Sequence, residues 1–115
     1  MTIIKQQDLI DSIADSLQYI SYFHPLDYIQ ALGEAYKAEQ SPAAKDAIAQ
    51  ILTNSRMCAE GHRPICQDTG IVVVFLKIGR NVRFEGTMPL DDMINEGVRK
   101  GYLDPDNKLR ASIVN

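Results

Sequence analysis

The sequence predicts an α+β fold: an N-terminal helical bundle of about three helices, then a short β-sheet segment and a further helix. Two observations carry this prediction. Apolar residues recur at helical spacing from Asp8 to Gly61, and the hydrophobic period changes at Gly70, where an apolar run begins. At 115 residues, with 45% hydrophobic and 23% charged residues, the composition is that of one globular domain.

The first two helices are separated by a proline. From Asp8 to Phe23 the apolar residues form one stripe, because they are three or four positions apart. The dipeptide His24-Pro25 interrupts that stripe, since proline has no N–H to donate within a helix. Pro25 is suited to the first turn of a second helix, which is expected to end near Gln40.

The third helix has both a start and a stop signal. Ser41 is an expected N-cap and Pro42 occupies the first helical position. Gly61 is expected to close the helix as a C-terminal glycine.

The second half has the shorter period of β-structure. Ile71 to Ile78 is rich in β-branched residues and predicts a buried strand, and after a Gly-Arg-Asn turn Val82 to Glu85 is expected to return as a short strand. A fourth helix is expected from about Leu90 to Tyr102, because its apolar residues share one face and Pro89 precedes it. The following DPDN is a turn signal.

Charge and hydropathy exclude several classes of protein. The net charge of −3 gives no reason to expect a nucleic-acid partner. No apolar run approaches the roughly 20 residues that span a bilayer, so no membrane partner is expected. The N-terminus has early acidic residues and no apolar region typical of a signal peptide, so a cytoplasmic location is expected. In such a reducing compartment the two cysteines are not expected to form a disulfide.

The stretch RPICQDTG joins the third predicted helix to the apolar run. Pro64 excludes a helix through it, so Cys66, Gln67 and Asp68 are expected on a loop held by a helix and a strand. A thiolate can be a metal ligand or a nucleophile, the amide can donate and accept, and the carboxylate can act as a base. The residues also fit a purely structural turn, and their spacing alone leaves both interpretations open.

Three local alternatives are weaker. Cys58, His62 and Cys66 stand four apart, but Pro64 breaks the helix that would align them for zinc, and closed zinc sites have four ligands. A nucleophile pairing Cys66 with His62 or His24 stays open. The segment DPDNKLRASIVN lacks the oxygen ligand and the glycine that a calcium loop needs at its fifth and sixth positions.

The combination of NSRMCAEGHRPICQDTGIVVVFLKIG, LDDMINEGVRKGY and LRASI resembles the N-terminal part of the class I, iron–sulfur-dependent fumarate hydratases. The likeness covers the whole chain and is most specific at CQDTG. The related tartrate dehydratases, which have two kinds of subunit, share this element. The resemblance implies that residues 1–115 are the N-terminal portion of a larger hydro-lyase domain, which reversibly hydrates fumarate to (S)-malate.

The resemblance also implies roles for individual residues. Cys66 corresponds to one of three cysteine ligands of a 4Fe–4S cluster. Gln67 and Asp68 correspond to residues that contact the dicarboxylate substrate, and Asp68 is the candidate catalytic residue. Arg110, in LRAS, corresponds to an arginine that binds a substrate carboxylate. Cys58 matches no ligand of the family and is expected to pack at the end of the third helix.

The chain carries only part of such a site. No cysteine follows Cys66, and one thiolate cannot hold a 4Fe–4S cluster. We therefore expect these residues alone to be inactive and to lack the cluster. They need the remainder of the same enzyme or a complementary subunit, and the complete enzyme is expected to be a homodimer. Two other functions stay open, a tartrate dehydratase subunit and a non-catalytic helical interaction domain.

Overall fold

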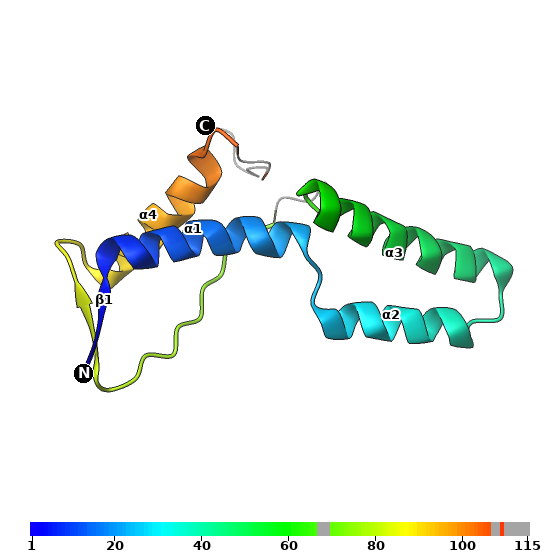
Figure 1. The fold of residues 1–115 in the computed structure, drawn as a ribbon, viewed down its shortest axis with the longest axis horizontal. Coiled ribbons are helices and arrows are strands. Elements are labelled where there is room, and N and C mark those ends of the chain that lie inside the picture. Colours follow the sequence, from blue (N-terminus) through cyan, green and yellow to red (C-terminus); the bar gives the residue numbers. More distant parts are fainter. Residues whose placement is uncertain (67–69, 107–108, 110–115) are drawn as a thin grey trace. The chain divides into compact units, whose positions relative to one another are not determined.

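The computed structural model describes residues 1–66, 70–106 and 109. Within these ranges the elements, in chain order, are β1 (Thr2–Lys5), α1 (Gln6–Tyr22), α2 (Leu26–Ala38), α3 (Pro42–Gly61), β2 (Val82–Glu85) and α4 (Leu90–Leu103) (Figure 1). The predicted class is confirmed, because residues 1–66 and 70–106 contain three helices, a two-stranded sheet and a further helix. None of the described helices has both the length and the apolar character needed to cross a membrane.

The chain divides into two compact units. One contains residues 1–18 together with the described part of 68–115, and the other contains the described part of 19–67. The three N-terminal helices are therefore shared between units, because α1 contributes its residues up to Gln18 to the first unit and the rest to the second.

The sheet of the first unit differs from the predicted one in its first strand. β1 and β2 pair in parallel, with Thr2 opposite Val82 and Lys5 opposite Glu85. β2 has the predicted bounds, whereas β1 was not predicted. A four-residue run directly before a helix has too few positions to show a period, and its partner is far along the chain.

The predicted buried strand at Ile71 to Ile78 is wrong for this chain. These residues form neither helix nor strand, and Figure 1 draws them as a plain trace leading to β2. They are not buried either: the side chain of Ile71 is 89% exposed and that of Phe75 is 92% exposed. The sequence pattern indicates that a segment favours burial in a sheet. A strand also needs a neighbouring strand whose backbone groups form hydrogen bonds with it.

The core of the first unit lies where α4 packs on α1. Its buried side chains are Ile10, Ala14, Leu17 and Met93. The two helices approach closely at Gly97, where a Cβ would lie 2.7 Å from the Cβ of Ile13 and 2.9 Å from the carbonyl oxygen of Ile10. Such a distance is shorter than real Cβ contacts, so a glycine is required for this approach.

Polar contacts fix both ends of the same helix pair. The Oε1 atom of Gln6 accepts hydrogen bonds from the backbone N–H groups of Thr87 and Met88, each at 2.9 Å. These bonds tie the chain that enters α4 to the start of α1. Near the other end, Nε2 of Gln18 donates to the carbonyl oxygen of Gly101 at 3.0 Å. An ion pair joins Lys100 with Asp11 between these two positions.

The second unit is built on the antiparallel pair of α2 and α3, which lie side by side in Figure 1. The predicted start of α3 is confirmed, because Oγ of Ser41 accepts from the N–H of Ala44 at 3.4 Å and Pro42 begins the helix. α2 starts at Leu26, so that Pro25, which was expected in the first turn, is the N-cap residue, and the helix ends at Ala38, close to the expected end near Gln40.

Candidate functional site

The loop that carries Cys66 begins with a left-handed turn at the end of α3. The helix ends at Gly61, as predicted, but the residue in the left-handed conformation is His62, with φ 51° and ψ 57°. The prediction that Gly61 itself provides the C-terminal turn is therefore wrong by one position. The N–H groups of His62 and Arg63 both donate to the carbonyl oxygen of Cys58, so the turn satisfies an otherwise unpaired helix-end acceptor.

Ring contacts explain why a histidine is tolerated in this turn. The imidazole of His62 stacks on the ring of Tyr22, with centroids 5.3 Å apart and planes 8° from parallel. The ring of Phe23 meets it edge-on at 5.9 Å. Because stacking of this kind is worth about 0.5–1.5 kcal/mol, it offsets the strain of a positive φ at a residue that has a Cβ.

Three contacts hold the chain immediately before Cys66. The N–H of Ile65 donates to the carbonyl oxygen of Ser21 at 2.9 Å, and the carbonyl oxygen of Ile65 accepts from Nδ2 of Asn54 at 2.9 Å. Sγ of Cys58 lies 3.4 Å from the carbonyl oxygen of Pro64. Residue 65 is thereby bonded on both its N–H and its carbonyl side, so the backbone leading into Cys66 is fixed by α1 and α3.

The two cysteines have opposite environments. Cys58 is buried, with 5% of its surface exposed, whereas Cys66 is exposed. Cys58 meets the packing prediction: its sulfur lies among Pro64 and Asn54, 3.7 Å from Oδ1 of Asn54. Cys66 presents its thiol to solvent at the end of an anchored loop, where a ligand or a second polypeptide can reach it.

The alternatives for Cys66 gain no support from the placement of the histidines. Nδ1 of His24 is 2.9 Å from Oγ of Ser55, and the ring of His62 is engaged with Tyr22 and Phe23. Within the described ranges neither imidazole forms a hydrogen bond with Cys66. The same ranges contain no group of three or more histidine, cysteine or acidic residues that is arranged to hold a metal ion.

Three predicted site residues lie outside the described part of the chain: Gln67, Asp68 and Arg110. Their assignments stay predictions. The structure does confirm the predicted turn that begins at Asp104, where the side chain accepts from the N–H of Asp106 at 2.8 Å.

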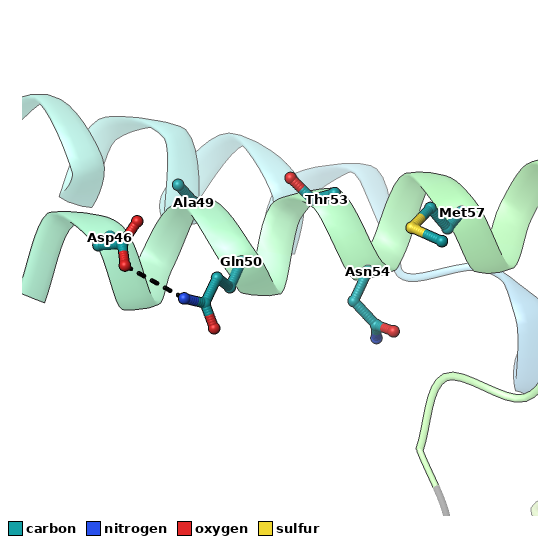
Figure 2. A pocket seen from close by; sticks show the side chains of 6 residues that line it. All are labelled: Asp46, Ala49, Gln50, Thr53, Asn54 and Met57. Atoms are coloured by element: carbon teal, nitrogen blue, oxygen red, sulfur yellow. Dashed lines mark hydrogen bonds between the residues drawn. The ribbon is translucent and has the colours of Figure 1, made fainter.

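A shallow hollow on α3 is a less convincing site. Figure 2 shows its lining side chains, which all project from this one helix: Asp46, Ala49, Gln50, Thr53, Asn54 and Met57. Its one carboxylate, Asp46, already accepts a hydrogen bond from Nε2 of Gln50 at 3.1 Å. Converging polar groups from several elements, which usually mark a binding site, are not part of this lining.

Sequence reasoning missed the residues that position Cys66. Asn54 is the clearest case, because its amide bonds the loop at Ile65. A signal exists in the sequence, since asparagine is a poor residue for a helix interior and its side chain is often used to bond backbone groups. Ser21 acts through its backbone carbonyl and leaves no such signal.

Comparison with known proteins decides the family. The family model described as fumarate hydratase (Fumerase) matches residues 10–115. The chain belongs to this family. A curated relative, the putative L(+)-tartrate dehydratase subunit alpha of Methanocaldococcus jannaschii, is 38% identical over 104 residues. The match covers 90% of this chain but only 36% of the relative, so the chain spans about a third of that protein's length.

Proposed function

We propose that this chain is the N-terminal part of a hydro-lyase that reversibly hydrates fumarate to (S)-malate. The observation that carries the proposal is the exposed thiol of Cys66 at the end of a loop fixed by α1 and α3, in a chain of the fumarate hydratase family. As the N-terminal third of such a protein, it contributes one part of a site that further polypeptide completes.

A 4Fe–4S cluster is the cofactor that the family resemblance implies, and the chemistry of the donor set fits one corner of it. Cys66 is exposed and has no competing hydrogen bond within the described ranges, whereas Cys58 is buried and occupied. Cys66 would therefore hold one iron, and two further thiolates would come from outside this chain. Bound through three cysteines, the cluster would supply an open iron as a Lewis acid.

Gln67, Asp68 and Arg110 supply binding and proton transfer in this proposal. Arg110 pairs with a substrate carboxylate, because a guanidinium can donate two parallel hydrogen bonds to it. Gln67 donates to the substrate and fixes its orientation. Asp68, next to Gln67, orients the substrate and is the candidate for moving the proton that the reaction requires.

Tartrate dehydration is the second candidate, and the relative from Methanocaldococcus jannaschii favours it. The name of that relative describes it as a subunit, which supports a complementary subunit as the alternative to a homodimer. Both substrates are dicarboxylates, so Arg110 and Gln67 have the same roles in either case. The homodimer and the cytoplasmic location stay predictions from the sequence.

Anaerobic assay of the complete, cluster-reconstituted enzyme tests the proposal. Cys66→Ala should abolish both the visible absorbance of the cluster and turnover. The matched control, Cys58→Ala, should keep both, because that thiol only packs against Pro64 and Asn54. A Cys66→Ala enzyme with normal iron content and normal turnover would sink the assignment.

Separate variants test the substrate roles. Arg110→Ala should keep the cluster and weaken substrate binding by about 30-fold or more, the effect of losing about 2–5 kcal/mol from a charge-assisted contact. Gln67→Ala and Asp68→Ala should also keep the cluster, and the Asp68 change should lose more turnover. Assays of the wild-type enzyme with fumarate and with L(+)-tartrate decide between the two substrates, because the wild type will turn over only its true substrate rapidly.

A further inference from the structure

The apolar segment 71–78 is exposed on both of its faces. Its exposed apolar side chains are Ile71, Val73, Val74, Phe75, Leu76 and Ile78. In an extended chain, odd and even positions point to opposite sides, and both sets are apolar here. A segment that is apolar on both sides is typical of a strand covered above and below, as in the interior of a layered sheet.

The backbone of the same segment is also unpaired. Within the described ranges, residues 71–78 form no backbone hydrogen bond to another part of the chain. Covering the apolar side chains without pairing these N–H and carbonyl groups would leave buried polar atoms unsatisfied. Whatever covers the segment must therefore supply at least one strand beside it as well as apolar surface on both faces.

We propose that residues 71–78 are an assembly strand that pairs with the C-terminal remainder of the hydro-lyase. Two observations select this occupant. The chain is the N-terminal part of its family and covers only 36% of the relative's length, so about two thirds of that protein has no counterpart here. That missing part is large enough to provide a strand and two covering layers, which a short peptide or small ligand is not.

The position of the segment in the chain gives this pairing a consequence for the site. Ile71 directly follows Gly70, the last residue of the CQDTG motif, so pairing of the segment would fix the chain on the far side of Cys66, Gln67 and Asp68. This inference rests on family membership and not on the proposed substrate, so it survives if the protein acts on tartrate or has lost activity.

Amide hydrogen exchange on two polypeptides tests the proposal. The 115-residue chain should exchange freely at residues 71–78, at every protein concentration. The longer polypeptide that carries the remainder should exchange these amides at least about a hundredfold more slowly, as paired core strands do. Free exchange in both polypeptides would overturn the proposal. Slower exchange in the short chain with rising concentration would also overturn it, because a second copy would then be the occupant.

Charged substitutions sharpen the test. Phe75→Asp should leave the helical circular dichroism of the 115-residue chain unchanged, since Phe75 is 92% exposed there, and should abolish the protection of residues 71–78 in the longer polypeptide. Met57→Asp is the matched control, because Met57 is 62% exposed beside polar side chains on α3 (Figure 2). It should leave the protection intact. Equal loss of protection in both variants would contradict a specific strand contact.

Discussion

The chain on the two sides of the CQDTG motif differs in composition, bonding and exposure. On the N-terminal side, Ile65 is bonded through both its N–H and its carbonyl oxygen to Ser21 and Asn54. On the C-terminal side, residues 71–78 are apolar, exposed and unpaired within the described ranges. The comparison teaches that the described part of the chain anchors the backbone before the motif, whereas the segment after the motif has no strand partner within the same ranges.

The largest expected effect concerns the thiols on the anchored side. A soluble maleimide should modify Cys66 at least about 100-fold faster than Cys58 under native conditions. Cys58 is buried, so its reaction requires local opening of the end of α3, and an opening free energy of about 2.7 kcal/mol gives that factor. Peptide mapping by mass spectrometry measures both rates, and concentrated urea should equalise them. Similar rates without denaturant would mean that the loop is not anchored as described.

A pair of glycine substitutions tests whether the contact of α4 with α1 at Gly97 belongs to the core of the first unit. Gly97→Ala should lower the free energy of unfolding by about 1–3 kcal/mol, because the new methyl group collides with Ile13 and with the backbone of Ile10. Gly33→Ala is the matched control in α2, where the new Cβ has nothing within 4 Å apart from its chain neighbours and the backbone of its own helix. It should raise the free energy of unfolding by about 0.4–1 kcal/mol.

Urea denaturation of the 115-residue chain measures both changes. A third variant, Phe75→Ser, should stay within about 0.5 kcal/mol of the wild type, because its side chain is already exposed. A loss at Phe75 as large as that at Gly97 would show that residues 71–78 already contribute to a core in this chain, and the contrast between the two sides of the motif would fail.

Removing the side-chain amide of Asn54 should loosen the backbone before the CQDTG motif, so that its amides exchange faster. Asn54→Ala deletes the hydrogen bond to the carbonyl oxygen of Ile65, a net contribution of about 0.5–1.5 kcal/mol. Alanine is a better helix former than asparagine, and this gain partly offsets the lost hydrogen bond in the global free energy of unfolding. The local opening of the loop has no such compensation. The local readout is amide exchange at Ile65 and Cys66, which should accelerate about 2- to 10-fold.

Gln50→Ala is the matched control for Asn54→Ala. Gln50 lies one turn away on the same helix and bonds only Asp46 within the described ranges (Figure 2). Its replacement should leave exchange at Ile65 unchanged. If both variants accelerate the loop equally, the effect comes from α3 as a whole and not from the Asn54 contact.

The smallest effect is the pH dependence of the ion pair between α1 and α4. Hydrogen bonds from Lys100, and then from Gln7, lower the pKa of Asp11, and the bond to Asp11 raises the pKa of Lys100. The contribution of Asp11 to the free energy of unfolding is therefore present above the unfolded pKa of about 3.9. It is lost as the pH falls through the lower pKa of the folded state. That of Lys100 is present below about pH 10.4 and is lost as the pH rises through the higher folded value.

Asp11→Asn should then lower stability by a small, constant amount between about pH 5 and pH 9, with the difference from the wild type disappearing in acid. Urea denaturation at a series of pH values measures it, and concentrated salt should reduce it by screening. A difference that grows in acid would contradict the sign.

The sequence by itself determined the helices and their boundaries to within about two residues, because caps, prolines and a repeating apolar face are local signals. The Ser41 cap and the break at Pro25 are examples. It also determined the family, and it identified Cys58 as the cysteine that packs at the end of the third helix.

Only the tertiary structure decided how these elements are used. The pairing of β1 with β2, the close approach of α4 to α1 at Gly97, and the bond from Asn54 to Ile65 all join residues whose partners no local pattern identifies. The wrongly predicted strand at residues 71–78 shows again that a local sequence pattern does not identify tertiary partners. Its apolar, β-branched residues record a preference for burial in a sheet, but burial requires a neighbouring strand and covering layers, and those belong to the fold and not to the segment.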